Sequence, residues 1–260
     1  MILMEASNYT AYDKVINKVR FFFKEKGFIE VFTQNNFSVI EPMTNSELFT
    51  QHSPEIYYPQ TKQTQLDQFL LENPQESGFF SMSYQFQENT LYPFIEFTSN
   101  DNIRQFYTEF FNYMGLNQSV SENEYDDICN FYEINTLTDD IFSRINQDYG
   151  TISCINNFPE RVTSSWNIQW NDTESHYYKN MILINGINIM NLFEKSCNTE
   201  KMYNMFHTDN NYLQQLYQRF GEDRVENELN EFLQKDFLPR IGGTIDLTKI
   251  ISIFFMFNLI

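Results

Sequence analysis

FFSMSYQFQENTLYPFIEF, residues 79–97, contains two runs of strand-forming residues on either side of a polar stretch. The runs Phe79–Tyr84 and Pro93–Thr98 are rich in aromatic residues, which favour a pleated and partly buried backbone. The polar stretch between them, QFQENTLY, is typical of a loop of medium length. We therefore expect an antiparallel hairpin that begins at Gly78.

Before this hairpin, VRFFFKEKGFIEVFTQ (Val19–Gln34) predicts a helix followed by a strand. The helix covers Tyr12–Lys26, because its apolar residues recur at helical spacing, and Gly27 then provides a C-terminal stop. The strand follows at Phe28–Thr33. After the hairpin, IGGTIDLTKIISIFF (Ile241–Phe255) predicts a last strand that starts at a glycine pair, and a last helix.

The chain between these segments alternates helical and strand-like patterns. We expect helices at Gln65–Glu72, Asp101–Gly115 (capped by Asp101), Glu124–Glu133, Asp139–Asp148, Thr199–Phe206, Asn211–Phe220 and Asp223–Gln234. Residues Gly150–Lys195 read as successive antiparallel strands, TISCINNF, SSWNIQW, YYKNMILING and INIMNLFEK, with turns at Asn171-Asp172 and Asn185-Gly186. The result is a meandering sheet.

Composition sets limits on the class of protein. A chain of 260 residues with 42% hydrophobic content is long enough for one sizeable core, and a single domain is the simplest reading. The net charge of -18 disfavours a broad phosphate-binding surface, so we do not expect tRNA or another nucleic acid as partner.

Neither end of the chain predicts a targeting or membrane segment. The N-terminus is too polar for a signal peptide, and the apolar C-terminal run IISIFFMFNLI is too short for a membrane span, so we expect a buried helix there. The three cysteines, Cys129, Cys154 and Cys197, show neither a disulfide framework nor zinc spacing. We expect a soluble, cytoplasmic protein.

Five further stretches complete a pattern of ordered motifs. They are YPQTKQTQLDQFLLENP, GFFSMSYQFQEN, INNFPERVTSSWNI, FEKSCNTEKMYNMFHT and RFGEDRVENELNEFLQKDFLPRIGG. Together with the three segments above, they resemble the catalytic domain of the aspartate, asparagine and lysine branch of class II aminoacyl-tRNA synthetases. The chain is still more similar to the free-standing paralogues of that branch, which also resemble ammonia-dependent asparagine synthetase. The resemblance runs from about Lys18 to Phe255.

The resemblance implies an α+β fold with a six- to seven-stranded antiparallel sheet flanked by helices. It implies that residues 1–260 form one class II synthetase-like core without an anticodon-binding domain. It also implies a homodimer built through residues 15–34.

Several charged residues of the resembled motifs are substituted. An arginine and a glutamate of the motif that residues 79–97 resemble are replaced by Gln85 and Gln87, with Glu88 adjacent. Lys249 stands where the motif that Ile241–Phe255 resembles has an arginine, and Asn188 stands where a magnesium-binding glutamate is expected. Adenylate formation places negative charge on phosphate oxygens, which need preorganised cations. Lysine keeps the charge but lacks the two-donor geometry of arginine.

The site residues that the resemblance implies fall into four groups. The catalytic residues are Lys249, Gln85 and Glu194. The ATP-binding residues are Gln85, Gln87, Glu88, Glu96, Asn188 and Lys249, with adenine stacking near Phe94 or Tyr84. The amino-acid-binding residues are Gln60, Gln63, Asp67 and Lys195. Magnesium would be held by Glu194 and Asn188.

Structural roles compete with several of these assignments. Glu96 is equally consistent with a carboxylate that braces the sheet through backbone amides or a lysine. Lys62, Arg104 and Arg161 are candidates for the missing cation, but surface ion pairs explain them better. His52, His176 and His207 are scattered and predict no metal cluster.

Two functions remain open. The first is an adenylate-forming ligase that uses ATP and Mg²⁺ with a small polar amino acid and transfers the product to ammonia, an amine or another acceptor, with weakened activity. The second is a catalytically inactive paralogue that acts as a ligand-binding or dimeric interaction protein. The substituted motif residues favour the second, and the retained Glu96, Glu194 and Lys195 favour the first.

Overall fold

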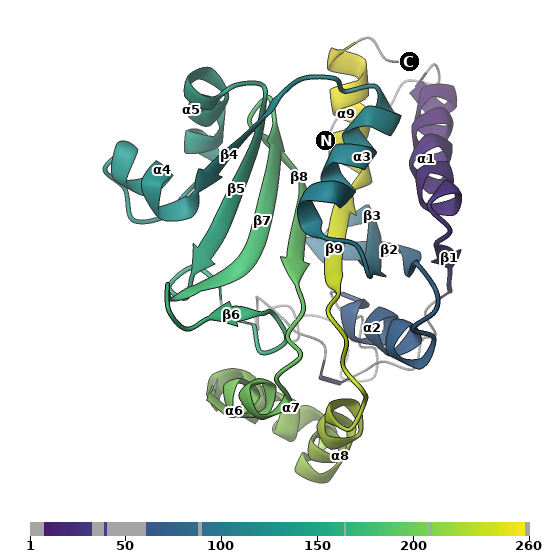
Figure 1. The fold of residues 1–260 in the computed structure, drawn as a ribbon, viewed down its shortest axis with the longest axis vertical. Helices are drawn as coiled ribbons and strands as arrows, with labels where there is room; N and C mark the ends of the chain where they lie inside the picture. The colour runs from purple at the N-terminus through teal and green to yellow at the C-terminus, as the bar shows by residue number, and fades with distance from the viewer. Residues whose placement is uncertain are drawn as a thin grey trace.

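The computed structural model describes residues 8–32, 39–40, 61–87, 90–163, 165–208 and 210–257. One nine-stranded sheet runs through these residues in the order β1-β2-β3-β9-β8-β7-β5-β4, with β6 paired to β7 (Figure 1). Its strands are β1 (Ile29–Glu30), β2 (Gly78–Gln87), β3 (Thr90–Ser99), β4 (Val120–Glu124), β5 (Ile152–Pro159), β6 (Trp170–Asn171), β7 (His176–Ile184), β8 (Ile187–Glu194) and β9 (Ile241–Asp246).

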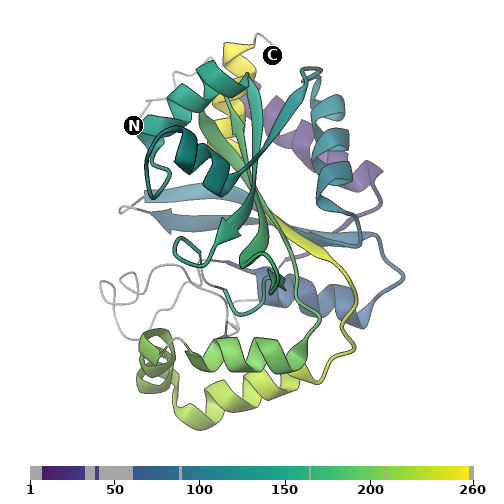
Figure 2. The same cartoon turned by 60° about the vertical axis from the view of Figure 1, so that its left-hand side comes forward.

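Helices cover the sheet on both faces and at one end. They are α1 (Asn8–Glu25), α2 (Gln63–Glu72), α3 (Ile103–Met114), α4 (Tyr125–Phe131), α5 (Asp139–Tyr149), α6 (Thr199–Thr208), α7 (Asn210–Phe220), α8 (Glu222–Leu233) and α9 (Leu247–Met256). Both ribbon views show α6, α7 and α8 gathered beyond one end of the sheet, below α2 (Figures 1 and 2).

The main core lies where α1, α3 and α9 pack on one face of the sheet. Aromatic rings form its centre, with Phe97 of β3 stacked on Phe106 of α3 at 4.2 Å between centroids. Phe23 of α1 stacks on Phe80 of β2 at 4.8 Å. Each of these four side chains is 0% exposed. Their burial against the sheet explains why apolar residues recur at helical spacing in the sequences of α1 and α3.

The opposite face is covered in two separate places. At one side, Phe79 of β2 packs with Leu66 and Leu70 of α2. At the other side, α4 and α5 pack on β5 and β7 through a second group of buried residues that includes Ile155 and Leu183. Between α2 and the α4–α5 pair, the central strands carry polar side chains on this face.

The predicted α+β class and the largely antiparallel sheet are confirmed. The described sheet has more strands than expected, and its two outer pairs, β1 with β2 and β4 with β5, are parallel. The hairpin of β2 and β3 is confirmed, but the expected loop of medium length is wrong, because the two strands stay paired as far as Gln87 and Thr90. The turn at Asn185-Gly186 is also confirmed, and both of its residues have positive φ. The C-terminal apolar run forms the buried helix α9. Among the described residues, no helix is long and apolar enough to cross a membrane.

Three local predictions were wrong. β4 was missed, because VSENE is polar and pairs only at an edge of the sheet. Within SSWNIQW, Trp166 and Asn167 form a turn, Ile168 makes an isolated antiparallel bridge to Lys195, and only Trp170 joins β6. Helix α3 is capped by Asn102, whose side chain accepts from Gln105 N at 2.8 Å, while Asp101 instead pairs with Lys26 at 3.0 Å.

Removal of the ring at Phe106 tests the aromatic core. We expect Phe106→Ala to lower the free energy of unfolding by about 3–5 kcal/mol, because it leaves a cavity beside Phe97. Phe255→Ala is the matched control, since Phe255 is 43% exposed on α9, and it should change stability by no more than about 0.5 kcal/mol. Urea titrations measure both. Equal losses in the two variants would contradict this description of the core.

Candidate functional site

Cross-strand partners place a row of side chains on one face of the central sheet. Thr98 of β3, Gly242 of β9, Phe193 of β8 and Lys179 of β7 are successive neighbours across the strands. Directly paired residues of neighbouring strands point to the same face. A Cβ built on Gly242 would meet side-chain atoms of Phe193 and Gln63, so this is the face that α2 covers.

A second row lies two residues further along each strand. It consists of Glu96, Thr244, Asn191 and Met181, again paired in order across the same four strands. We call the surface made by Glu96, Thr98, Thr244, Asn191 and Lys179 the polar face. Thr244, Asn191 and Lys179 are partly buried, and Glu96 and Thr98 are fully buried. Ligand sites commonly contain a small number of polar groups that converge in this way.

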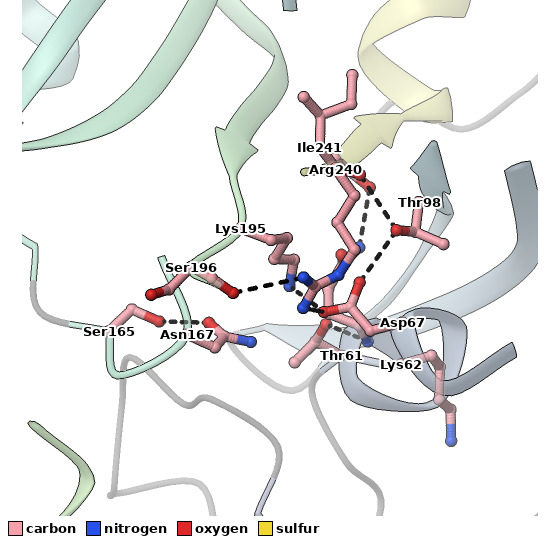
Figure 3. Close-up of polar contacts among 12 residues, drawn as sticks. Thr61, Lys62, Asp67, Thr98, Ser165, Asn167, Lys195, Ser196, Arg240 and Ile241 are labelled. Carbon is pink, nitrogen blue, oxygen red and sulfur yellow. Dashed lines mark hydrogen bonds and ion pairs between the residues drawn. The ribbon is translucent and has the colours of Figure 1, made fainter. Parts of the chain in front are cut away.

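At the α2 end of the polar face lies a buried ionic cluster of Asp67, Lys195 and Arg240 (Figure 3). Asp67 Oδ2 lies 3.0 Å from Arg240 Nη2 and 3.3 Å from Lys195 Nζ. Asp67 Oδ1 accepts from the Thr98 hydroxyl at 3.0 Å. All three charged side chains are 0% exposed. The cluster therefore joins α2, the end of β8 and the residue before β9.

The carboxyl of Asp67 is held in its charged form. Burial opposes its ionisation, but the charges of Arg240 and Lys195 and the hydrogen bonds from Arg240 and Thr98 keep the pKa of this carboxyl below its ordinary value. Arg240 is positioned further by the carbonyl oxygens of Leu238 and Ser196. Removing one partner of such a group leaves an uncompensated buried charge, which is strongly destabilising.

Glu96 makes three hydrogen bonds within the chain. Its Oε2 accepts from the Thr61 hydroxyl at 2.7 Å and from Lys62 N at 2.8 Å, and its Oε1 accepts from Ser83 Oγ at 2.6 Å. It thereby fixes the residues that lead into α2 to the centre of the sheet. The sequence left two roles open for Glu96, ligand binding and bracing of the sheet. These hydrogen bonds are contacts of the bracing kind.

Gln63 lies at the start of α2, against the glycine pair of β9. Its Nε2 donates to Gly243 O at 3.0 Å, and no partner for its buried Oε1 is present among the described residues. The same oxygen would lie 2.5 Å from a Cβ added to Gly242. Glycine at position 242 thus leaves room for the side chains of Gln63 and Lys195, which a Cβ there would force to move.

Lys249 stands at the rim of the polar face, in the first turn of α9. Its Nζ lies 3.4 Å from Asp246 Oδ2, and its backbone N donates to Asp246 Oδ1 at 3.0 Å. Asp246 pairs with Phe94 across the strands, and residues Phe94 and Glu96 share one face. The Lys249 side chain is 46% exposed, so it is accessible from solvent.

Glu194 lies on the other face from Glu96. It pairs with Ile241, whose side chain belongs to the core under α1, α3 and α9. Glu194 lines a pocket of about 480 Å³ together with Asn102, Gln105 and Cys197, and Lys195 and Arg240 of the ionic cluster line the same pocket. Burial raises the pKa of its carboxyl.

The expected magnesium pair of Glu194 and Asn188 does not fit this geometry. The two residues stand at opposite ends of β8, six residues apart, which corresponds to about 20 Å of extended strand. Magnesium ligands all lie within about 2.1 Å of one ion. No group of three or more His, Cys, Asp and Glu suited to a metal occurs in the described part of the chain. Glu194 and Asn188 therefore do not form one magnesium site.

Other predicted residues lie partly beyond what the structure describes. Gln60, Glu88 and His52 fall outside the described residues, and Gln85 and Gln87 are placed in β2 by their backbone alone. Arg104 pairs with Glu122 and Arg161 pairs with Asp126, which are the surface ion pairs expected as the simpler explanation.

Sequence reasoning missed two residues, Arg240 of the ionic cluster and Lys179 of the polar face. Arg240 was not selected, although an arginine between Pro239 and a buried strand is a usable signal. Lys179 was not selected either, although it is the single lysine in the strand HYYKNMILI. The pairing of Arg240 with Asp67 joins residues 173 positions apart, and no local pattern reports such a contact.

Comparison with solved structures identifies the fold. Aspartyl-tRNA synthetase from Entamoeba histolytica matches 94% of this chain and 54% of its own, with a TM-score of 0.67 and 10% identity. Asparaginyl-tRNA synthetase from Pyrococcus horikoshii, complexed with asparaginyl-adenylate, matches 94% and 64%, with a TM-score of 0.68 and 11% identity. The Entamoeba histolytica asparaginyl-tRNA synthetase with asparaginyl-adenylate matches 94% and 62%, with a TM-score of 0.70 and 11% identity.

The chain spans about 54–64% of the length of these synthetases. No protein-family model and no curated protein matches its sequence. At 10–11% identity the likeness establishes the fold, and the class II synthetase-like core predicted from the three motifs is confirmed.

The ionic cluster predicts a pH-dependent stability. We expect Asp67→Asn to cost about 3–5 kcal/mol at neutral pH, because Lys195 and Arg240 stay buried without a counter-charge. The folded-state pKa of Asp67 is below its unfolded value, so this contribution is complete above about pH 4 and is lost as pH falls through the folded pKa. In urea titrations the gap between wild type and variant should therefore be smaller at about pH 3 than at pH 7.

Asp126→Asn provides the control for this comparison. It removes the same charge from an exposed pair with Arg161, and we expect it to cost no more than about 1 kcal/mol. If both variants lose the same stability, the buried cluster does not have the importance assigned to it.

Proposed function

We propose that this protein binds ATP and a small polar amino acid on the polar face, and that it forms the aminoacyl-adenylate with weakened activity. The observation that carries the proposal is the match of 94% of the chain to synthetases, two of them solved with asparaginyl-adenylate. The polar face supports it, because partly buried polar groups on the central strands lie between two patches of covering helices.

The chemistry proposed for this face is attack of an amino-acid carboxylate on the α-phosphate of ATP. Negative charge develops on the phosphate oxygens, and a nearby cation stabilises it. Lys249 is the cation at the rim, and Asp246 holds it at the start of α9. Adenine is then expected against Phe94, which lies on the same face as Glu96. Because Gln85 replaces an arginine in the resembled pattern, we expect slow turnover.

The acidic surface bears on the acceptor. A net charge of -18 opposes the binding of a polyanion. We therefore propose ammonia, an amine or another small molecule as acceptor, and not tRNA.

A second candidate is an inactive protein that keeps only binding or dimerisation. The ionic cluster favours it specifically, because Lys195 is 0% exposed and its charge is already met by Asp67. Glu96 is similarly engaged by Thr61, Lys62 and Ser83. Groups that hold one another in this way stabilise the fold whether or not a substrate is present.

Amino-acid-dependent exchange of pyrophosphate into ATP separates the two candidates. We expect slow exchange in the wild type and a loss of roughly a hundredfold or more in Lys249→Ala, because one transition-state donor is removed. Lys201→Ala is the matched control, since Lys201 is also a surface lysine paired with an aspartate, Asp172, and its exchange rate should equal that of the wild type. Absence of exchange together with absence of an ATP-induced thermal shift would support the inactive form.

A homodimer through residues 15–34 is the proposed assembly. Three large apolar side chains of this segment are exposed: Phe21 at 58%, Ile29 at 38% and Phe32 at 91%. They adjoin β1, which pairs with β2 at an outer position of the sheet. Exposed apolar residues beside a sheet edge mark a surface that another chain can cover.

Sedimentation velocity tests the assembly. We expect a dimer for the wild type and a monomer for Phe32→Asp, because a carboxylate is too costly to bury in an apolar interface. Phe131→Asp changes another exposed phenylalanine, which lies on α4 and is 61% exposed, and this variant should remain dimeric. A monomeric wild type, or dissociation by the α4 variant alone, would show that residues 15–34 are not the interface.

A further inference from the structure

Lys179 is a partly buried cation in the middle of β7. Its Nζ donates to the Thr163 hydroxyl at 3.3 Å and lies 4.8 Å from the centroid of the Phe158 ring. No carboxylate pairs with it in the part of the chain that the structure describes. Lys195, the buried lysine of the ionic cluster, has Asp67 as its counter-ion. Lys179 thus differs from Lys195 in lacking one.

An ammonium group in this setting is costly to keep charged. Its neighbours are the Phe158 ring, the Thr163 hydroxyl and the cross-strand partner Phe193, none of which carries a charge. Burial alone lowers the pKa of Lys179 to about 8. The group is therefore still mainly protonated at neutral pH, and an anion placed beside it would recover the lost solvation energy.

The position of Lys179 connects it with the proposed ligand site. It lies in the same row as Thr98 and Gly242, and on the same face as Glu96. Three strand spacings separate β7 from β3, or about 14 Å. Thr244 and Asn191 occupy the floor between Glu96 and the β7 strand. A ligand that reaches across this floor from the α2 side meets Lys179 at its far end.

The excess of acidic residues in this protein makes a lysine without a carboxylate partner unusual. It contains 35 acidic and 17 basic residues, so carboxylates are abundant partners for any lysine. The surface lysines Lys201 and Lys235 have such partners in Asp172 and Glu72. Lys179 instead has a hydroxyl that orients its ammonium and leaves two of its three donors for another acceptor.

We propose that Lys179 binds the anionic group of the ligand on the polar face, a carboxylate or a phosphate, with Thr163 as the residue that positions its ammonium. The identity of the ligand as amino acid or nucleotide rests on the proposed function, but the anion site itself does not. The shared chemistry is an oxyanion that accepts hydrogen bonds from a desolvated ammonium.

Lysine methylation with ¹³C formaldehyde, followed by NMR, tests the proposal on the intact protein. The signal absent in Lys179→Arg identifies the residue, and its titration midpoint is measured alone and with L-aspartate, ATP or inorganic phosphate. We expect at least one probe to raise the midpoint, because the bound anion stabilises the charged form. If none of the three moves it, the proposal is wrong. A rise with aspartate alone identifies a carboxylate, and a rise with ATP and phosphate identifies a phosphate.

Binding constants of the same probe separate a contact from a structural effect. Lys179→Met should weaken the active probe at least tenfold, Lys179→Arg should retain part of the affinity, and Lys201→Met should retain all of it. Unchanged affinity in Lys179→Met overturns the proposal even where pyrophosphate exchange proceeds normally, so the proposed function then stands. Conversely, a midpoint raised by phosphate in a protein without exchange supports the anion site and rejects the ligase.

Discussion

The carboxylate of Asp67 is the contact on which the arrangement of the site depends. It lies on α2 and meets Lys195 after β8 and Arg240 before β9, so three distant parts of the chain converge on one buried group. Because a buried ion pair stabilises little beyond the cost of desolvation, its main effect is to fix geometry. Thr98 and Ile241 O extend the same network to β3 and β9, which places α2 in one position over the sheet.

The position of α2 in turn determines what the polar face offers. Glu96 secures the residues that enter α2, and Gln63 secures its first turn against β9. These contacts use up the polar groups nearest to α2. The side chains further across the sheet, Asn191, Thr244 and Lys179, are only partly buried. The partly exposed polar side chains of this face therefore lie away from α2.

Sequence reasoning succeeded where structure is determined locally. The hairpin of β2 and β3 followed from two aromatic runs, and α1 followed from an apolar stripe that ends at Gly27. It failed where the partner in space decides the outcome. β4 is a polar segment that becomes a strand by pairing with β5. Glu194 and Asn188 were paired as magnesium ligands because the resemblance implied it, yet they stand at opposite ends of β8, and Glu194 lines a pocket beside Asn102 and Gln105.

The same distinction explains why Arg240 and Lys179 escaped attention. A motif compares residues by type and order, whereas a charged side chain acquires its role from burial and from the charges around it. Arg240 is buried with an acidic partner, Asp67, and this ion pair holds α2 in place. Lys179 is partly buried with a hydroxyl and an aromatic ring as partners, so its charge is left for something outside the chain. In a protein so rich in carboxylates, Lys179 pairs with no acidic side chain of the described structure, and we therefore interpret it as a residue that binds an anionic ligand.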